Sequence, residues 1–120
     1  MNGKGRHVTL DYTGFKGEGQ WMLSVLRSAV ERSNVREVHN HVSEFDGTES
    51  PPGFAAVVLI DESHVSAHCY AEEGILAVDC FTCGGVDPNG IADDIHAELI
   101  AVNPKIVLLQ RTELIRFIQK

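Results

Sequence analysis

The sequence lacks a long hydrophobic run and lacks any excess of positive charge. Its longest apolar stretch, residues 54–60, is far shorter than the ~20 residues of a membrane-spanning helix. Ten lysines and arginines face 17 aspartates and glutamates, which gives a formal net charge of −7. A chain this acidic is poorly suited to nucleic acid or to an anionic membrane surface, and it favours a cationic small molecule as its ligand. We therefore expect no nucleic-acid partner and no membrane association.

Cysteine is scarce as well, and the first residues are polar. Three cysteines are an odd number, which argues against a disulfide framework. Residues 1–6 (Met-Asn-Gly-Lys-Gly-Arg) lack the apolar stretch that signal peptides contain. We therefore expect reduced thiols and a cytoplasmic protein. The length of 120 residues predicts a single domain, 1–120.

The few possible metal ligands are not spaced like a metal site. Cys80 and Cys83 form a lone C-x-x-C, and only His96 follows them, whereas structural zinc needs a second pair of ligands. A thioredoxin-like role requires this motif at a helix N-terminus, but Cys80 falls inside a strand pattern. We therefore expect no metal, and we interpret Cys80 as a small core residue. Cys83 precedes two glycines and is expected at the mouth of a loop.

Hydrophobic periodicity predicts two helices and six strands in the order β-α-β-β-β-β-α-β. Apolar residues spaced three and four apart from Met22 to Val30 mark one face of a helix over about 18–33. Asp87-Pro88 is typical of a second helix start, and Asn103-Pro104 of its end. Strands are expected at residues 6–12, 35–45, 54–60, 64–70, 74–81 and 105–111, while the apolar tail 114–118 is left unassigned.

This order predicts an α+β fold, a two-layer α/β sandwich with an antiparallel sheet. Strands joined by short turns are usually antiparallel neighbours, and two helices suffice to cover one face of such a sheet. The strand at 54–60 is apolar on both sides, so the other face also needs cover. A second subunit stacked on the sheet provides it, and we expect a dimer of this kind.

Reactive side chains concentrate between Asp61 and Cys83. By itself, a serine after an acidic residue in a tight turn is most often only a turn residue. However, the run 61–68 (Asp-Glu-Ser-His-Val-Ser-Ala-His), then Glu72, then 77–84 (Ala-Val-Asp-Cys-Phe-Thr-Cys-Gly) resembles the bacterial and archaeal S-adenosylmethionine decarboxylases. Gly5-Arg6-His7 and Val86-Asp87-Pro88 add to the resemblance, which extends from about Gly5 to Val107.

The resemblance implies a proenzyme that cleaves its own backbone between Glu62 and Ser63. The serine hydroxyl attacks the preceding carbonyl, the resulting ester is broken by β-elimination, and the dehydroalanine loses ammonia to water. The products are a β chain, 1–62, and an α chain, 63–120, which begins with a pyruvoyl group. His68 matches the family's base for the elimination, a role to which imidazole side chains are suited. Neither a metal nor pyridoxal phosphate is then required.

The resemblance further implies decarboxylation of S-adenosylmethionine in polyamine (spermidine) biosynthesis by a homodimer of processed protomers. The pyruvoyl group forms a Schiff base with the substrate amine and accepts the electrons that decarboxylation leaves behind. Cys83 matches the family's proton donor, a role that a protonated thiol can fill. Glu72 matches the acidic residue that holds the ribose hydroxyls, and Thr82 is counted among the substrate-binding residues.

The chain departs from the family's pattern where the substrate is recognised. Glu49 replaces an aromatic residue that stacks on adenine, Ala55 replaces a serine, and Tyr70-Ala71 replaces Trp-Pro. Phe54 or Tyr70 is predicted to supply the missing stacking surface. One alternative is an arginine or ornithine decarboxylase in which Glu49 or Glu72 binds the cationic side chain. A second is an unprocessed, inactive homologue that acts by pairing with an active subunit.

Overall fold

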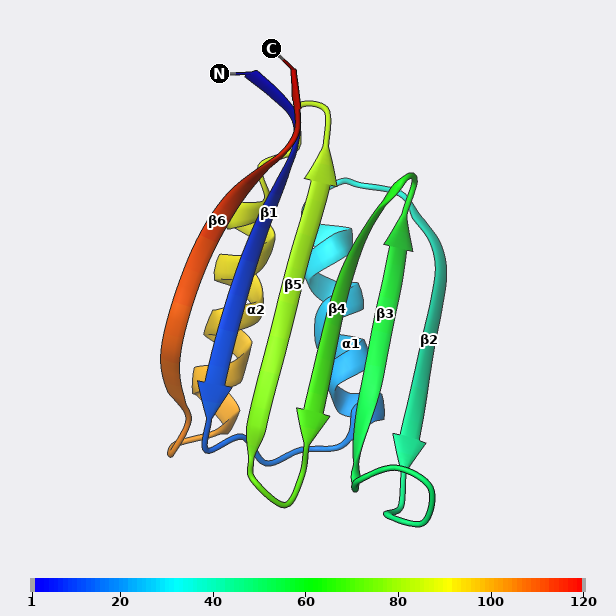
Figure 1. Ribbon diagram of the computed structural model, residues 1–120, viewed down its shortest axis with the longest axis vertical. Helices are drawn as coiled ribbons and strands as arrows, with labels where there is room; N and C mark the ends of the chain where they lie inside the picture. The colour runs from blue at the N-terminus through cyan, green and yellow to red at the C-terminus, as the bar shows by residue number, and fades with distance from the viewer. Residues whose placement is uncertain (1, 120) are drawn as a thin grey trace.

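Six antiparallel strands form one sheet, and two helices cover one of its faces (Figure 1). The computed structural model describes residues 2–119. The strand order is β2-β3-β4-β5-β1-β6, so β2 and β6 are the edges. This arrangement confirms the predicted α+β sandwich. The elements are β1 (Asn2–Thr13), α1 (Gly19–Arg32), β2 (Glu37–Phe45), β3 (Gly53–Ile60), β4 (Ser63–Tyr70), β5 (Ile75–Cys83), α2 (Pro88–Val102) and β6 (Val107–Gln119).

The core lies between the sheet and the helices, because alternate side chains of each central strand point toward α1 and α2. The buried face of α1 is the predicted one, and in α2 Ile91, Ile95 and Leu99 are fully buried. Burying a side chain of this size stabilises the fold by ~1.5–3 kcal/mol. As predicted, Asp87 caps the start of α2, and its carboxylate accepts a hydrogen bond of 2.9 Å from the Asn89 backbone N–H.

The other face of the sheet carries no helix, and we call it the open face. Strand alternation assigns side chains to it: His7 faces it from β1, His64, Ser66 and His68 from β4, and Asp79 and Phe81 from β5. In β3 the open-face positions are also apolar, as predicted, and Leu59 there is 40 % exposed. Among residues 2–119, neither helix is both long and apolar enough to cross a membrane.

The last strand is longer than predicted. It begins at Val107, because Lys105 lies in a turn, and it continues through the unassigned tail to Gln119. The cause is its pairing with β1, whose register extends from Thr13↔Val107 to Asn2↔Gln119. Such a pairing joins the two ends of the sequence, so local periodicity does not reveal it.

Candidate active site

The predicted cleavage site lies in the tight turn between β3 and β4, at the upper end of the sheet in Figure 1. Ser63 is the first residue of β4, pairs with Ile60 and is 5 % exposed. Asp61 and Glu62 form the two-residue connection, in which Asp61 has a left-handed backbone with φ of 49°. Its carboxylate accepts hydrogen bonds of 2.6 and 2.9 Å from Arg36. The Glu62–Ser63 peptide bond is therefore held at the tip of a hairpin.

Cys83 lies at the same end of the sheet. It is the last residue of β5, and extending the register beyond His64↔Phe81 by two residues puts Glu62 opposite Cys83. The thiol is half-buried, and the two following glycines have no atom within 4 Å of where a side chain would begin. The fold therefore places the turn that contains Ser63 beside the end of β5, although strand alternation points Ser63 toward the helices and Cys83 toward the open face.

The other two cysteines lie in the core. Cys80 is fully buried, and desolvation raises the pKa of its thiol to about 12. Burial also raises the pKa of the Cys69 thiol. Both thiols are therefore protonated and inert at neutral pH, which leaves Cys83 as the accessible one.

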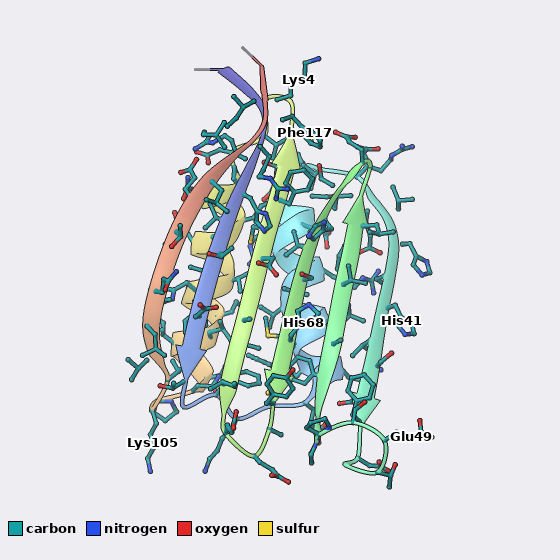
Figure 2. The ribbon with its side chains drawn as sticks, in the orientation of Figure 1. Lys4, His41, Glu49, His68, Lys105 and Phe117 are labelled. Atoms are coloured by element: carbon teal, nitrogen blue, oxygen red, sulfur yellow. The ribbon has the colours of Figure 1, made fainter. Side chains whose placement is uncertain are left out.

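His68 lies far from Ser63 within the chain. The two residues are five positions apart on β4, which corresponds to about 17 Å along a strand. Since five is an odd number, they also point to opposite faces, with Ser63 toward the helices and His68 toward the open face. Figure 2 shows His68 well below the turn, where it pairs with Ala55 on one side and Ala77 on the other. Within one protomer, His68 cannot reach the proton on the Ser63 α-carbon.

Two of the predicted substrate-binding residues share a pocket. Tyr70 and Glu72 line a cavity of about 430 Å³ with Glu73 and the two prolines before β3. This pocket lies at the lower end of the sheet, on the side of His68 and away from Ser63. Glu49 is exposed on the nearby loop 46–52, as Figure 2 shows. The structure thus places three of the predicted substrate-binding residues, Glu49, Tyr70 and Glu72, at the end of the sheet that is farther from Ser63.

Two other predicted substrate-binding residues face the helices. Phe54 is 4 % exposed, and its ring packs edge-on against Phe15 at 6.0 Å between centroids. Thr82 is 1 % exposed, and its hydroxyl donates a hydrogen bond of 2.8 Å to the Val86 carbonyl. Phe54 therefore offers no stacking surface on the open face, which leaves Tyr70, 54 % exposed, as the aromatic residue in position for that role.

A histidine cluster on the open face was not predicted. His7 Nε2 lies 3.3 Å from Asp79 Oδ1, and the His7 and His64 rings meet edge-on at 6.1 Å. Burial, followed by the neighbouring His7, lowers the pKa of His64. The sequence alone does not reveal this cluster, because only the pairing of β1 and β4 with β5 joins these residues. Among residues 2–119, no three His, Cys, Asp or Glu side chains are placed to hold a metal ion.

Comparisons with known proteins agree on one family. The family described as S-adenosylmethionine decarboxylase matches residues 6–112. The S-adenosylmethionine decarboxylase proenzyme of Symbiobacterium thermophilum is 35 % identical over 100 residues, covering 79 % of this chain and 73 % of its own length. The proenzyme of Shouchella clausii is 35 % identical over 121 residues, with coverage of 92 % and 87 %. The crystal structure of the adenosylmethionine decarboxylase of Aquifex aeolicus superposes with a TM-score of 0.80 at 25 % identity, covering 100 % of this chain and 96 % of that one.

Proposed function

Since this chain belongs to the S-adenosylmethionine decarboxylase family, we propose that it is a self-processing, pyruvoyl-dependent carboxy-lyase acting on S-adenosylmethionine in the cytoplasm. Its products are decarboxylated S-adenosylmethionine, for polyamine (spermidine) synthesis, and CO₂. The observation that carries the proposal is the placement of the Glu62–Ser63 turn beside Cys83 at one end of the sheet. These residues fit the formation and use of a pyruvoyl group at position 63.

Processing begins with the Ser63 hydroxyl. Its oxygen attacks the Glu62 carbonyl, the C–N bond breaks, and an ester replaces the amide. A base then removes the proton from the Ser63 α-carbon, and the Glu62 carboxylate leaves by β-elimination. The remaining dehydroalanine tautomerises, takes up water and releases ammonia, which leaves a pyruvoyl group on chain 63–120 and a free carboxylate on chain 1–62.

The base must come from a second copy of the chain, because His68 lies about 17 Å from Ser63 within its own protomer. Two copies can stack by their open faces about a two-fold axis that lies between the two sheets and runs perpendicular to the strands. The strands of one copy then run opposite to those of the other. The upper end of each sheet then lies over the lower end of its partner. The Glu62–Ser63 turn and Cys83 of one copy then lie over the partner's His68, and the dimer contains two such sites.

The groove on the open face has the composition expected of a surface that a second subunit covers. A shallow groove of about 370 Å³ crosses it, and its walls are mostly apolar. The polar side chains in the groove are three histidines and two serines, and no carboxylate or lysine interrupts it among its lining residues. The lining residues are His41, Ser43, Ala55, Ala56, Val57, Leu59, His64, Ser66 and His68.

In the decarboxylation itself, the pyruvoyl group supplies the electron sink that no ordinary side chain provides. Cys83 returns a proton to the substrate α-carbon after CO₂ has left. The partner's Tyr70 and Glu72 bind the part of the substrate beyond its amino acid end. Tyr70 offers a ring to stack on adenine, and Glu72 accepts hydrogen bonds from the ribose hydroxyls.

Replacing Cys83 by alanine should separate processing from turnover. Because processing uses Ser63 and the partner's His68, Cys83→Ala should still be cleaved into two chains. Its kcat should fall by ~10²–10⁴-fold, the usual contribution of a general acid. Chain cleavage on denaturing gels and CO₂ release from carboxyl-labelled substrate measure the two steps. An undiminished kcat would remove Cys83 from the mechanism.

The substrate is tested by measuring CO₂ release from S-adenosylmethionine, arginine and ornithine. All three present the same amino acid end, so they differ in what the Tyr70–Glu72 pocket must bind. We expect release from S-adenosylmethionine, and we expect Tyr70→Ala to raise its KM more than Tyr70→Phe does. Glu73 and Glu49 add negative charge near the pocket, an arrangement that favours arginine or ornithine as the second candidate. Release from either of these, with none from S-adenosylmethionine, would overturn the first choice.

A further inference from the structure

The turn between β3 and β4 is bound by an arginine from a neighbouring segment. Arg36 lies just before β2, and its Nε and Nη2 atoms donate hydrogen bonds of 2.9 and 2.6 Å to one carboxylate oxygen of Asp61. Glu37 pairs with Ile60 across β2 and β3, so Arg36 and Asp61 occupy the next positions of the same two segments. The arginine therefore binds the residue that immediately precedes Glu62.

Asp61 has a backbone conformation that a side chain disfavours. Of the two residues in the turn, only Asp61 is left-handed, with φ of 49°. Glycine is favoured at a left-handed position of a two-residue hairpin, because it has no Cβ to clash with the backbone. Aspartate tolerates this conformation better than most residues do. At this position its carboxylate, 46 % exposed, gains the ion pair with Arg36.

We infer that Arg36 is a positioning residue for the cleavage. The inference rests on the proposed function, since it concerns the bond that is cut there. Ser63 is fixed on one side of this bond by its pairing with Ile60, and Arg36 fixes Asp61 on the other side. Glu62 lies between two fixed residues, which limits the positions that its carbonyl can take relative to the Ser63 hydroxyl. Limiting the motion of two reacting groups speeds an intramolecular attack.

The same arginine has a second task once the chain is cut. The elimination leaves a new carboxylate on Glu62, which is still joined to Asp61. Arginine has five N–H donors, and Arg36 uses two of them for Asp61, so three remain for the new carboxylate. The substrate brings its own carboxylate to position 63, and like charges repel each other there. By holding the end of chain 1–62 beside β2, Arg36 keeps that end from competing with the substrate.

The rate of cleavage tests the first task. In Arg36→Ala, cleavage should be about two- to five-fold slower than in the wild type, the range that the loss of an exposed ion pair gives. The Arg36 side chain is 77 % exposed, which places it in this range. Arg36→Lys keeps the charge and should recover part of the rate. Denaturing gels of freshly made protein follow the conversion of the 120-residue chain into its two fragments.

Arg27→Ala is the matched control for the cleavage rate. Arg27 on α1 is 53 % exposed and forms an ion pair of 2.8 Å with Glu37, so its loss removes a comparable pair beside β2 without touching the turn. This variant should be cut as fast as the wild type. If the wild type is cut and Arg36→Ala is cut equally fast, or if both variants are slowed equally, Arg36 does not position the turn, while the proposed function stands. If the wild type is never cut, both are wrong.

Fully cleaved protein tests the second task. In Arg36→Ala, the KM for S-adenosylmethionine should rise by about two- to five-fold with kcat unchanged, because the released chain end competes for the site but takes no part in the reaction. Carboxypeptidase should also remove Glu62 from folded Arg36→Ala sooner than from the wild type, which the mass of fragment 1–62 shows. Both fragments end in the same residues, so the difference reports how firmly the end is held. Equal KM values together with equal trimming would exclude the second task.

Discussion

Ser63→Ala is expected to remain a single chain of 120 residues and to release no CO₂ above background. Without the hydroxyl, the Glu62 carbonyl has no nucleophile to attack it, so neither the ester nor the pyruvoyl group forms. Because decarboxylation has no electron sink in this variant, the loss should be ~10⁶-fold or more, down to the uncatalysed rate. Denaturing gels and intact mass spectra measure the cleavage, and labelled CO₂ measures the activity.

Ser66→Ala is the matched control for this variant. Ser66 is a second buried serine on β4, 7 % exposed against 5 % for Ser63, and it takes no part in the cleavage. It should be cut between residues 62 and 63 as the wild type is. If the wild type itself stays uncut and inactive, the chain is instead the unprocessed homologue that pairs with an active subunit. If it stays uncut and active, the pyruvoyl mechanism is wrong.

The second large effect is expected for cleavage in mixed dimers, because each processing site combines residues of two copies. His68→Ala alone should be cleaved slowly, because the elimination loses its base, and Ser63→Ala alone should not be cleaved. When the two variants are expressed together, mixed dimers form that contain one complete pairing. In that pairing Ser63 of the His68→Ala copy faces the intact His68 of the Ser63→Ala copy. We therefore expect the His68→Ala chain to be cleaved faster in the mixture than when it is expressed alone.

A different tag on each chain shows which of the two copies has been cleaved. Fragment 63–120 should carry the tag of the His68→Ala copy and never that of the Ser63→Ala copy. The control is co-expression of His68→Ala with a doubly substituted chain that lacks both Ser63 and His68, which should not restore cleavage. Equal cleavage in the mixture and in this control would show that each protomer processes itself without its partner's histidine.

Much of the fold follows from local pattern. The caps of α2 and the apolar face of α1 are set by residues close in sequence, so both helices are predicted near their observed bounds. The unassigned tail differs, since it becomes a strand only by pairing with β1 at the other end of the chain. Strand pairing over such a separation leaves no periodic signal in a single sequence.

The site is predictable in its parts but not in its assembly. Family-like motifs indicate Ser63, His68 and Cys83. The strand predicted over 64–70 leaves out Ser63, so alternation assigns Ser63 and His68 to opposite faces only because β4 includes Ser63. Phe54 illustrates the same limit, because it is predicted to supply a stacking surface for the substrate, whereas strand alternation turns its ring into the core. Side-chain direction depends on strand register, which tertiary packing determines.

Reductive trapping tests the central claim most directly. Purified protein is incubated with S-adenosylmethionine and sodium cyanoborohydride, and the denatured chains are weighed by mass spectrometry. We predict two chains, of which fragment 63–120 gains the mass of the decarboxylated substrate bound through its amine, while fragment 1–62 is unchanged. A single uncut chain without an adduct, in a sample that releases CO₂ from S-adenosylmethionine, would contradict the account.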